Sequence, residues 1–179
     1  METLTRSADL IRVVLTGSES TGKTAIACQL AEHYGAELAP EFVREFAVRK
    51  AAPIDFADTE QIARGQMALE DEHTTRATRL LIQDTDLLST VVYGGHYYGQ
   101  CAEWIKQAAR YRRPNLYLLL EIDVPWVPDE VRDRETRREE MQQLFRAAVA
   151  ASGSPYAVIQ GGWEQRLQRA REAIDGLLD

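Results

Sequence analysis

The sequence predicts an α/β fold in which a parallel sheet lies between two layers of helices. Short apolar runs alternate along the chain with longer segments of helical periodicity, which is the pattern of parallel strands joined by helical crossovers. A glycine-rich stretch follows the first apolar run and leads directly into the first helical segment. Composition agrees, because 45% of the 179 residues are hydrophobic and 27% are charged. We expect a single domain spanning residues 1–179.

The expected strands are the short apolar runs, which suit strands covered by helices on both faces. They span residues 11–15, 37–40, 80–84, 116–122 and 157–160. Pro40 closes the second run, Asp84 ends the third, and Gly161-Gly162 turns the chain after the fifth. Together they predict a five-stranded parallel sheet, with ligands at the carboxyl ends of its strands.

The expected helices are the segments in which apolar residues recur every three or four positions. They span residues 24–34, 42–49, 59–79, 87–93, 102–111, 139–151 and 163–177. In the last segment, one face carries Trp163, Leu167, Ala170, Ile174 and Leu177. Gly65 weakens the expectation of an unbroken third helix, and Gly94-Gly95 is expected to end the fourth.

The glycine-rich stretch has two glycines with four residues between them, followed by a lysine and a hydroxyl residue. It reads Gly17-Ser18-Glu19-Ser20-Thr21-Gly22-Lys23-Thr24. This is the P-loop, or Walker A, pattern, whose backbone N–H groups cradle phosphates at the N-terminus of a helix. We expect these residues to bind ATP, with Lys23 reaching the β- and γ-phosphates and the Thr24 hydroxyl holding Mg²⁺. The fold is then a three-layer P-loop NTPase of the nucleoside- and nucleotide-kinase kind.

A second metal ligand is expected at the end of the third strand. Asp84 ends an apolar run there, as a Walker B carboxylate does, and hard oxygen ligands are what Mg²⁺ requires. We therefore expect Asp84 to lie opposite Thr24. The alternative for Asp84 is an N-cap on the helix that follows.

Charge and composition exclude several classes of protein. The net charge of −7 weighs against a nucleic-acid partner. The longest apolar runs, such as Leu116–Leu120, are too short to cross a bilayer, and residues 1–9 hold no apolar signal core. Cys28 and Cys101 show neither metal-type nor redox-type spacing, which predicts free thiols in a reducing compartment, the cytoplasm. The oligomeric state stays open, a homo-oligomer included.

Three kinds of P-loop protein compete for this pattern. A GTPase switch reads guanine through an Asn-Lys-x-Asp segment, but the single asparagine is Asn115, which leucine follows. An AAA-type ATPase usually adds a helical lid domain after the core, and little chain remains here for one. A small-molecule kinase needs an acceptor pocket between the second and third strands and an arginine-bearing lid. The sequence supplies both, which favours a kinase.

The expected lid spans about residues 126–140 and is rich in arginine. A closing arginine neutralises charge on the transferred phosphoryl group, and lid closure excludes water. Arg132, Arg134 and Arg137 are the candidates for this role. The alternative is a solvated helix with i,i+4 ion pairs such as Asp133 with Arg137.

Several short motifs resemble one known family in their order and spacing. They are Glu41-Phe42-x-Arg44-Glu45-Phe46, Gln61-Ile62-Ala63-x-Gly65, Asp84-Thr85-Asp86, the set Thr90, Tyr93, Tyr97 and Gly99, and Trp126-Val127-x-Asp129-x-x-Arg132. The chain resembles the ribosylnicotinamide kinase domain of bacterial NAD-biosynthesis and regulator proteins, from Val13 to about Val158. The resemblance implies transfer of phosphate from ATP to the 5′-hydroxyl of nicotinamide riboside, giving nicotinamide mononucleotide. It also implies a stand-alone kinase, because residues 1–10 have no room for the further domains of the relatives. Gln83 and Gly94-Gly95-His96 depart from the family pattern, which leaves the acceptor's identity open.

The expected acceptor site combines acidic residues with aromatic rings. Glu41 ends the second strand, where related nucleoside kinases place a carboxylate base, and Asp86 is expected to hold ribose hydroxyls or to exchange roles with it. Arg44 would orient these acids; its alternative is a structural ion pair. The cationic nicotinamide ring suits aromatic contacts, with Tyr93, Tyr97, Tyr98 and Trp126 as candidates.

The adenine is expected after the last strand, at Gly161, Gly162 and Trp163.

Two alternatives to the leading function stay open. One is a P-loop kinase for another nucleoside or small alcohol, and the other is a regulatory AAA-like ATPase that uses hydrolysis as a switch.

Overall fold

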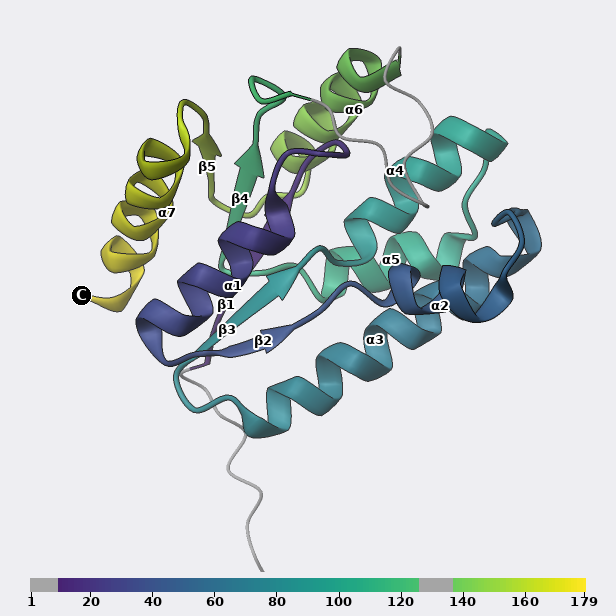
Figure 1. Ribbon diagram of the computed structural model, residues 1–179. Coiled ribbons are helices and arrows are strands. Elements are labelled where there is room, and N and C mark those ends of the chain that lie inside the picture. The colour runs from purple at the N-terminus through teal and green to yellow at the C-terminus, as the bar shows by residue number, and fades with distance from the viewer. Residues whose placement is uncertain (1–9, 126–136) are drawn as a thin grey trace, which may run out of the picture.

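The computed structural model describes residues 10–125 and 137–179, whose strands form one parallel sheet between helical layers (Figure 1). The strands are β1 (Ile11–Thr16), β2 (Glu37–Ala39), β3 (Leu80–Asp84), β4 (Leu116–Leu120) and β5 (Tyr156–Ile159). Their order is β2-β3-β1-β4-β5, and each neighbouring pair is parallel. The predicted five-stranded parallel sheet is confirmed, and it places β1 at the centre.

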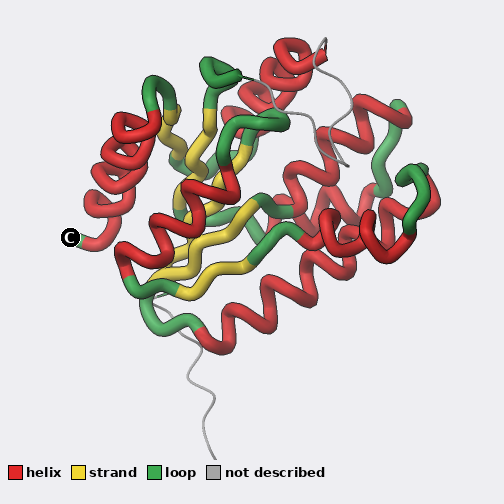
Figure 2. The backbone as a smooth tube through the Cα atoms, viewed as in Figure 1, coloured by secondary structure: helices red, strands yellow, loops and turns green. Residues whose placement is uncertain are grey.

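Helices cover both faces of this sheet (Figure 2). They are α1 (Lys23–Tyr34), α2 (Phe42–Lys50), α3 (Thr59–Arg76), α4 (Leu87–Tyr98), α5 (Glu103–Tyr111), α6 (Arg138–Ala151) and α7 (Trp163–Leu178), with a 3₁₀ turn at Phe56–Asp58. Helices α1 and α7 pack on one face and α4 and α6 on the other. Helices α3 and α5 pack against α4. None of the helices in the described segments is long and apolar enough to span a membrane.

Alternation along the central strand divides the core into two parts, because successive side chains of a strand point to opposite faces. Val13 and Leu15 pack against α1 and α7, whereas Val14 packs against α4 and α6. Strand β4 does the same, with Leu118 on the first side and Tyr117 on the second. The sheet is therefore buried on both faces, and the carboxyl ends of its strands lie together at one edge.

Two glycine expectations are settled by the helices. The prediction that Gly94-Gly95 ends the fourth helix is wrong, because α4 continues to Tyr98 and ends at Gly99, whose φ is 67°. A glycine inside a helix costs only about 1 kcal/mol relative to alanine, so packing can override it. Helix α3 is unbroken at Gly65 and ends at Arg76, three residues before the predicted end. A Cβ on Gly65 would lie 2.1 Å from the Phe42 ring, so this glycine lets α2 pack closely on α3.

Candidate functional site

The glycine-rich loop joins β1 to α1 at the carboxyl edge of the sheet. Gly17 has a φ of 130°, and a Cβ there would lie 2.6 Å from the Leu120 carbonyl oxygen. Gly22 is the N-cap of α1 with a φ of 83°, and a Cβ there would lie 3.2 Å from the Trp163 ring. Backbone angle and space both require glycine at the two positions.

Side chains from distant helices hold this loop in place. On α6, the Gln142 Oε1 accepts from the Ser18 N–H (2.8 Å), while its amide nitrogen donates to the Leu120 carbonyl (3.0 Å). On α7, the fully buried Arg166 donates to the Thr21 carbonyl (2.9 Å) and the Glu121 carbonyl (2.8 Å). These bonds fasten the P-loop to the end of β4.

The same loop is also tied to the segment after β4. Arg138, the first residue of α6, donates to the Ser20 carbonyl (2.9 Å) and to the Val124 carbonyl (2.7 Å). Sequence reasoning missed Gln142, Arg138 and Arg166 as supports of the loop. Arg166 precedes the apolar position Leu167 in an amphipathic helix, where a charged residue ordinarily faces solvent, so its pattern gave no signal.

The side chain of the loop lysine lies beside backbone carbonyl groups of the loop. The Lys23 ammonium donates to the Gly17 oxygen (3.1 Å) and to the Ser18 oxygen (2.7 Å), and its side chain is buried. Phosphate oxygens are stronger acceptors because they carry charge. At this position the Lys23 ammonium could leave the two neutral carbonyl oxygens and bind the phosphate oxygens of a nucleotide instead.

The structure brings Thr24 and Asp84 together at the ends of α1 and β3. The Thr24 hydroxyl donates to Asp84 Oδ2 at 2.6 Å, and Asp84 Oδ1 is buried with no hydrogen-bond partner. A buried carboxylate oxygen without a donor fits a hard cation, and Mg²⁺ uses one or two protein oxygens beside phosphate oxygens. Within the described segments there is no cluster of three or more His, Cys, Asp or Glu that could hold a metal alone.

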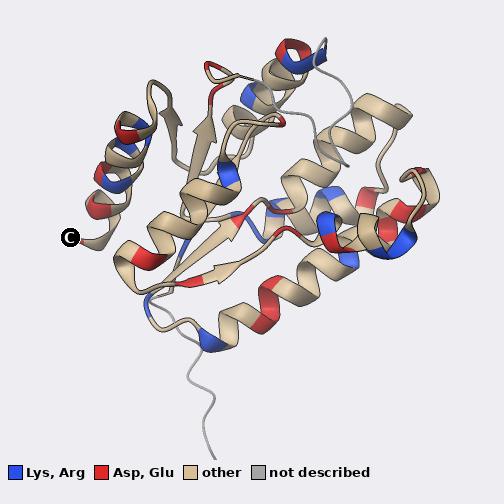
Figure 3. Cartoon of the chain, in the orientation of Figure 1, with Lys and Arg blue, Asp and Glu red and all other residues tan. Residues whose placement is uncertain are grey.

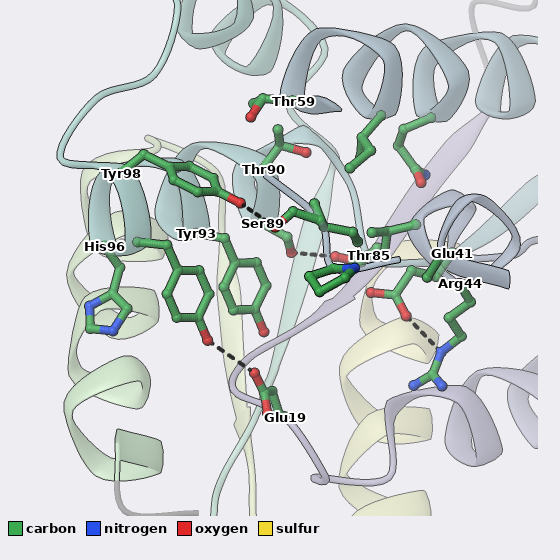
Figure 4. Close-up of a pocket in the computed structure, with 18 of the residues that line it drawn as sticks. Glu19, Glu41, Arg44, Thr59, Thr85, Ser89, Thr90, Tyr93, His96 and Tyr98 are labelled. Atoms are coloured by element: carbon green, nitrogen blue, oxygen red, sulfur yellow. Dashed lines mark hydrogen bonds and ion pairs between the residues drawn. The ribbon is translucent and has the colours of Figure 1, made fainter. Parts of the chain in front are cut away.

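A cavity of about 720 Å³ opens beside the P-loop, between α2, α3 and α4 (Figure 4). Acidic residues lie where β2 and β3 end, at Glu41 and Asp84, and the basic Lys23 begins α1; Figure 3 colours acidic residues red and basic residues blue. The cavity brings together most of the predicted acceptor residues. Among those lining it are Lys23, Glu41, Arg44, Asp86, Tyr93, Tyr97, Tyr98 and Arg137.

Glu41 follows β2 and is the N-cap residue of α2. At this position its carboxylate points into the cavity (Figure 4). The Arg44 Nε donates to Glu41 Oε2 at 2.8 Å. Burial and the nearby charge of Asp84 raise the pKa of Glu41, while Lys23 and Arg44 act in the opposite direction. A carboxylate with a raised pKa is a better proton acceptor than an ordinary exposed one.

Asp84 and Asp86 are separated by one residue in a rare backbone conformation. Thr85 has a φ of 72°, which is unfavourable for a β-branched residue, and its N–H donates to the Leu15 carbonyl at 3.0 Å. Asp84 thereby meets Thr24, whereas Asp86 lines the cavity and caps α4 by accepting from the Leu88 N–H (3.0 Å). Burial raises the pKa of Asp86 to about 6, opposed by its hydrogen bonds from Tyr117 and Leu88.

The tyrosines of α4 form a row along one side of the cavity. Tyr93 and Tyr97 stack with centroids 5.8 Å apart and planes 4° apart, and the edge of Tyr93 meets Phe145. A ring inserted between them would need roughly 7 Å, two ordinary carbon–carbon contacts. The stacked pair therefore leaves no gap for a ligand ring, and a ligand can contact only the hydroxyls, the ring edges and the outer face of the pair. The Tyr97 hydroxyl donates to Glu19 Oε1 at 3.4 Å and the Tyr98 hydroxyl to the Ile54 carbonyl at 3.2 Å.

The residues predicted to receive adenine lie on the other side of the P-loop. Trp163 begins α7 beside Gly22 and is 42% exposed. The Gly161 N–H donates to Asp123 Oδ2 at 2.6 Å, and Gly162 is the N-cap of α7. Three other predicted residues, Trp126, Arg132 and Arg134, lie outside the described residues, as does most of the expected lid.

A P-loop next to a Thr–Asp pair, with a cavity lined by carboxylates and basic side chains at the same edge of a five-stranded parallel sheet, defines a P-loop protein with a kinase-like fold. Its sequence matches a family model described as "AAA domain" over residues 12–166, so the chain belongs to that family. This family name describes a nucleotide-binding domain and no particular reaction.

Two curated relatives sharpen the family resemblance. The trifunctional NAD biosynthesis/regulator protein NadR of Escherichia coli is 27% identical over 139 residues, covering 74% of this chain and 34% of the relative. NadR of Salmonella typhimurium is 27% identical over 124 residues, covering 67% and 30%. The resemblance to the NAD-biosynthesis and regulator proteins is therefore confirmed. The chain spans about a third of the length of these relatives.

Solved structures confirm the fold. NadR protein in complex with NR superposes with a TM-score of 0.82 at 21% identity, covering 94% of this chain and 50% of that one. NadR in complex with NAD and AMP-PNP gives 0.80 at 21% identity, covering 94% and 49%. Thymidylate kinase from Ehrlichia chaffeensis gives 0.63 at 15% identity, covering 93% and 98%.

Proposed function

We propose that this chain is an ATP-dependent kinase that phosphorylates the 5′-hydroxyl of nicotinamide riboside to nicotinamide mononucleotide. The observation that carries the proposal is a single cavity that runs from Lys23 of the P-loop to the carboxylates of Glu41 and Asp86. The terminal phosphate of a nucleotide and an acceptor alcohol would meet there. The relationship to NadR, and the complexes of NadR with NR and with NAD and AMP-PNP, support the choice of substrates.

On the donor side, the backbone of residues 17–24 would bind the β- and γ-phosphates of ATP. The Lys23 ammonium would turn from the carbonyls of Gly17 and Ser18 to the phosphate oxygens. Thr24 and Asp84 would hold Mg²⁺, which neutralises phosphate charge when bound. Trp163 and Gly162 would border the adenine, at the exposed start of α7.

On the acceptor side, the oxygen of the 5′-hydroxyl would form a bond to the γ-phosphorus while Glu41 takes the proton of that hydroxyl. The bond from that phosphorus to the bridging oxygen breaks at the same time, and ADP leaves. The raised pKa of Glu41 suits this role, and Arg44 fixes one of its oxygens. Arg137 lines the cavity and would offset the developing charge on the phosphoryl group; Arg132 and Arg134 stay predictions for the same role.

Asp86 would hold the ribose hydroxyls, since it lines the cavity and is fixed at the start of α4. The nicotinamide ring would contact the tyrosine row from its outer side. Tyr93, Tyr97 and Tyr98 supply aromatic edges and hydroxyls there, and Glu19 adds a negative charge beside Tyr97 that suits a cationic ring. Trp126 stays a prediction as a further ring contact.

The proposal is tested by a panel of acceptors. The purified chain is incubated with ATP and MgCl₂ and with nicotinamide riboside, nicotinic acid riboside, uridine, adenosine or thymidine, and ADP release and product mass are measured. We expect acceptor-dependent ADP release and a mass gain of one phosphoryl group on nicotinamide riboside. Efficient transfer only to a different nucleoside would establish the alternative kinase. ADP release that no acceptor changes would instead favour a regulatory ATPase.

A further inference from the structure

Tyr117 is the one polar residue in the otherwise all-leucine β4 run, and its side chain is 1% exposed. It lies level with Val14 of β1, which lies level with Gln83 of β3, and it points to the α4 and α6 side of the sheet. Its hydroxyl reaches across β1 and donates to Asp86 Oδ2 at 2.7 Å. Phenylalanine would fill the same space, so packing alone does not require this hydroxyl.

The bond from Tyr117 determines what Asp86 can offer a ligand. An ionised carboxylate has about four acceptor sites, two on each oxygen. The Leu88 N–H occupies one on Oδ1 and the Tyr117 hydroxyl one on Oδ2. Each oxygen thus keeps a further acceptor site, and both oxygens are fixed in direction. Two neighbouring hydroxyls of a ligand fit such a pair of acceptors.

We propose that Tyr117 is a positioning residue that fixes Asp86 to bind the two adjacent hydroxyls of a riboside, so that the site prefers ribosides to 2′-deoxyribosides. This inference rests on the proposed kinase function and extends it, because it assigns a role in substrate selection to a residue of the sheet core. Tyr117 acts on the ligand through Asp86 alone.

The test compares Tyr117→Phe with the parent on nicotinamide riboside and on its 2′-deoxy analogue. We expect kcat/KM for the riboside to fall by about tenfold or more, as for a lost hydrogen bond to a charged group. The preference for the riboside over the deoxy analogue should shrink, and the KM for ATP should stay unchanged. Tyr34→Phe is the matched control, because its hydroxyl bonds Asp175 on the far α1–α7 side.

A purely structural role predicts another result: a lower Tm for Tyr117→Phe with the preference for riboside over deoxy analogue unchanged, which would overturn the inference. Calorimetric binding of nicotinamide riboside to Asp86→Asn, alone and combined with Tyr117→Phe, gives an independent reading. The second substitution should add no further loss, and additive losses would contradict action through Asp86. If Tyr117→Phe does not fold, site-specific 3-fluorotyrosine keeps the shape while strengthening the donor, and should change the preference for riboside over deoxy analogue; an unchanged preference would refute the proposal. A parent inactive on every acceptor would instead defeat the proposed function.

Discussion

The phosphate end and the acceptor end of this cavity are constructed in different ways. At the proposed phosphate end, eight contiguous residues would supply the backbone, the cation and one metal ligand, and glycine is required by φ and by space. At the acceptor end, Glu41, Asp86 and the tyrosines come from separate segments, and each is oriented by a partner from another element or another turn.

The difference has consequences for mutation. A contiguous loop whose shape is set by its backbone tolerates little change at a glycine, because a Cβ there alters the phosphate-binding backbone itself. A site assembled from side chains depends on the residues that pack behind those side chains. Substituting such a supporting residue should alter acceptor selectivity more than it reduces turnover. Substitutions at the acceptor end should therefore separate acceptor turnover from nucleotide binding, whereas those at the phosphate end should not.

Glu41→Gln should have the largest effect, since it removes the proposed base while keeping size. We expect kcat to fall by about 10²–10⁴-fold, the usual contribution of general base catalysis. Affinity for ATP, measured by calorimetry, should stay nearly unchanged because Glu41 lies at the acceptor end. Glu45→Gln on the same helix is the control, with an exposed side chain paired to Arg49. Near-normal turnover by Glu41→Gln would remove this residue from the chemistry.

Gly17→Ala tests the phosphate end. Its Cβ would meet the Leu120 carbonyl oxygen at 2.6 Å, at a φ of 130°. We expect a loss of about 2–4 kcal/mol in the free energy of unfolding, from steric conflict and backbone strain together. Nucleotide affinity and acceptor turnover should fall together, as read by calorimetry and by steady-state kinetics.

Gly35→Ala tests a glycine that is required by its backbone angle and not by space. Gly35 has a φ of 58° at the end of α1, and an added Cβ would have no atom within 4 Å. The substitution should lower stability by about 1 kcal/mol and leave nucleotide binding intact. Equal losses in the two variants would show that the contact with Leu120 is unimportant.

Gly65→Ala should destabilise the acceptor end by less than Gly17→Ala destabilises the phosphate end. The new Cβ would lie 2.1 Å from the ring of Phe42, which directly follows Glu41. We expect a loss of about 1–3 kcal/mol, the range for overpacking in a core, measured by chemical denaturation. The KM for the acceptor should rise while the KM for ATP stays constant. If both KM values change equally, the two ends are not independent.

The pH dependence of stability gives a further test behind the acceptor end. Burial and the charge of Asp86 raise the pKa of Glu70 from 4.5 to about 7, against the effect of Arg112 and Gln66. The folded state thus holds a proton on Glu70 that the unfolded state has released, so this residue's contribution to stability falls as pH rises through that interval. The Tm of the parent minus that of Glu70→Gln should drift downward by roughly 5–10 °C between these pH values.

Glu72→Gln, an exposed position on the same helix, is the control for that measurement. Its Tm difference from the parent should show no comparable drift over the same interval. A flat difference curve for Glu70→Gln would mean that Glu70 keeps its charge inside the folded protein.

The sequence was sufficient to predict the strands and the polar residues that gather where the strands end. All five strands lie within two residues of their predicted limits, because a short buried apolar run has few other interpretations. Glu41, Asp84 and Asp86 could be found because polar residues at strand ends meet at one edge of a parallel sheet.

The supports of the site could not be found in the same way. Gln142 bonds a residue 124 positions away, and Arg166 bonds one 145 positions away, so no local pattern marks either of them. Tyr117 looks like one more core residue of β4 until its hydroxyl is placed beside Asp86. The prediction that Gly94-Gly95 ends the fourth helix was wrong because it followed local helix propensity, whereas the packing of α4 maintains the helix through both glycines.

Gly95→Ala should have the smallest effect and the opposite sign to Gly65→Ala. Gly95 lies inside α4 with no atom within 4 Å of an added Cβ, so alanine meets no obstacle. Alanine also restricts the unfolded chain, and we expect a gain of about 0.5–1 kcal/mol in the free energy of unfolding. Acceptor and ATP kinetics should match the parent. A loss of stability at Gly95 would show that α4 needs this glycine for a reason other than space, and would weaken the explanation given for Gly65.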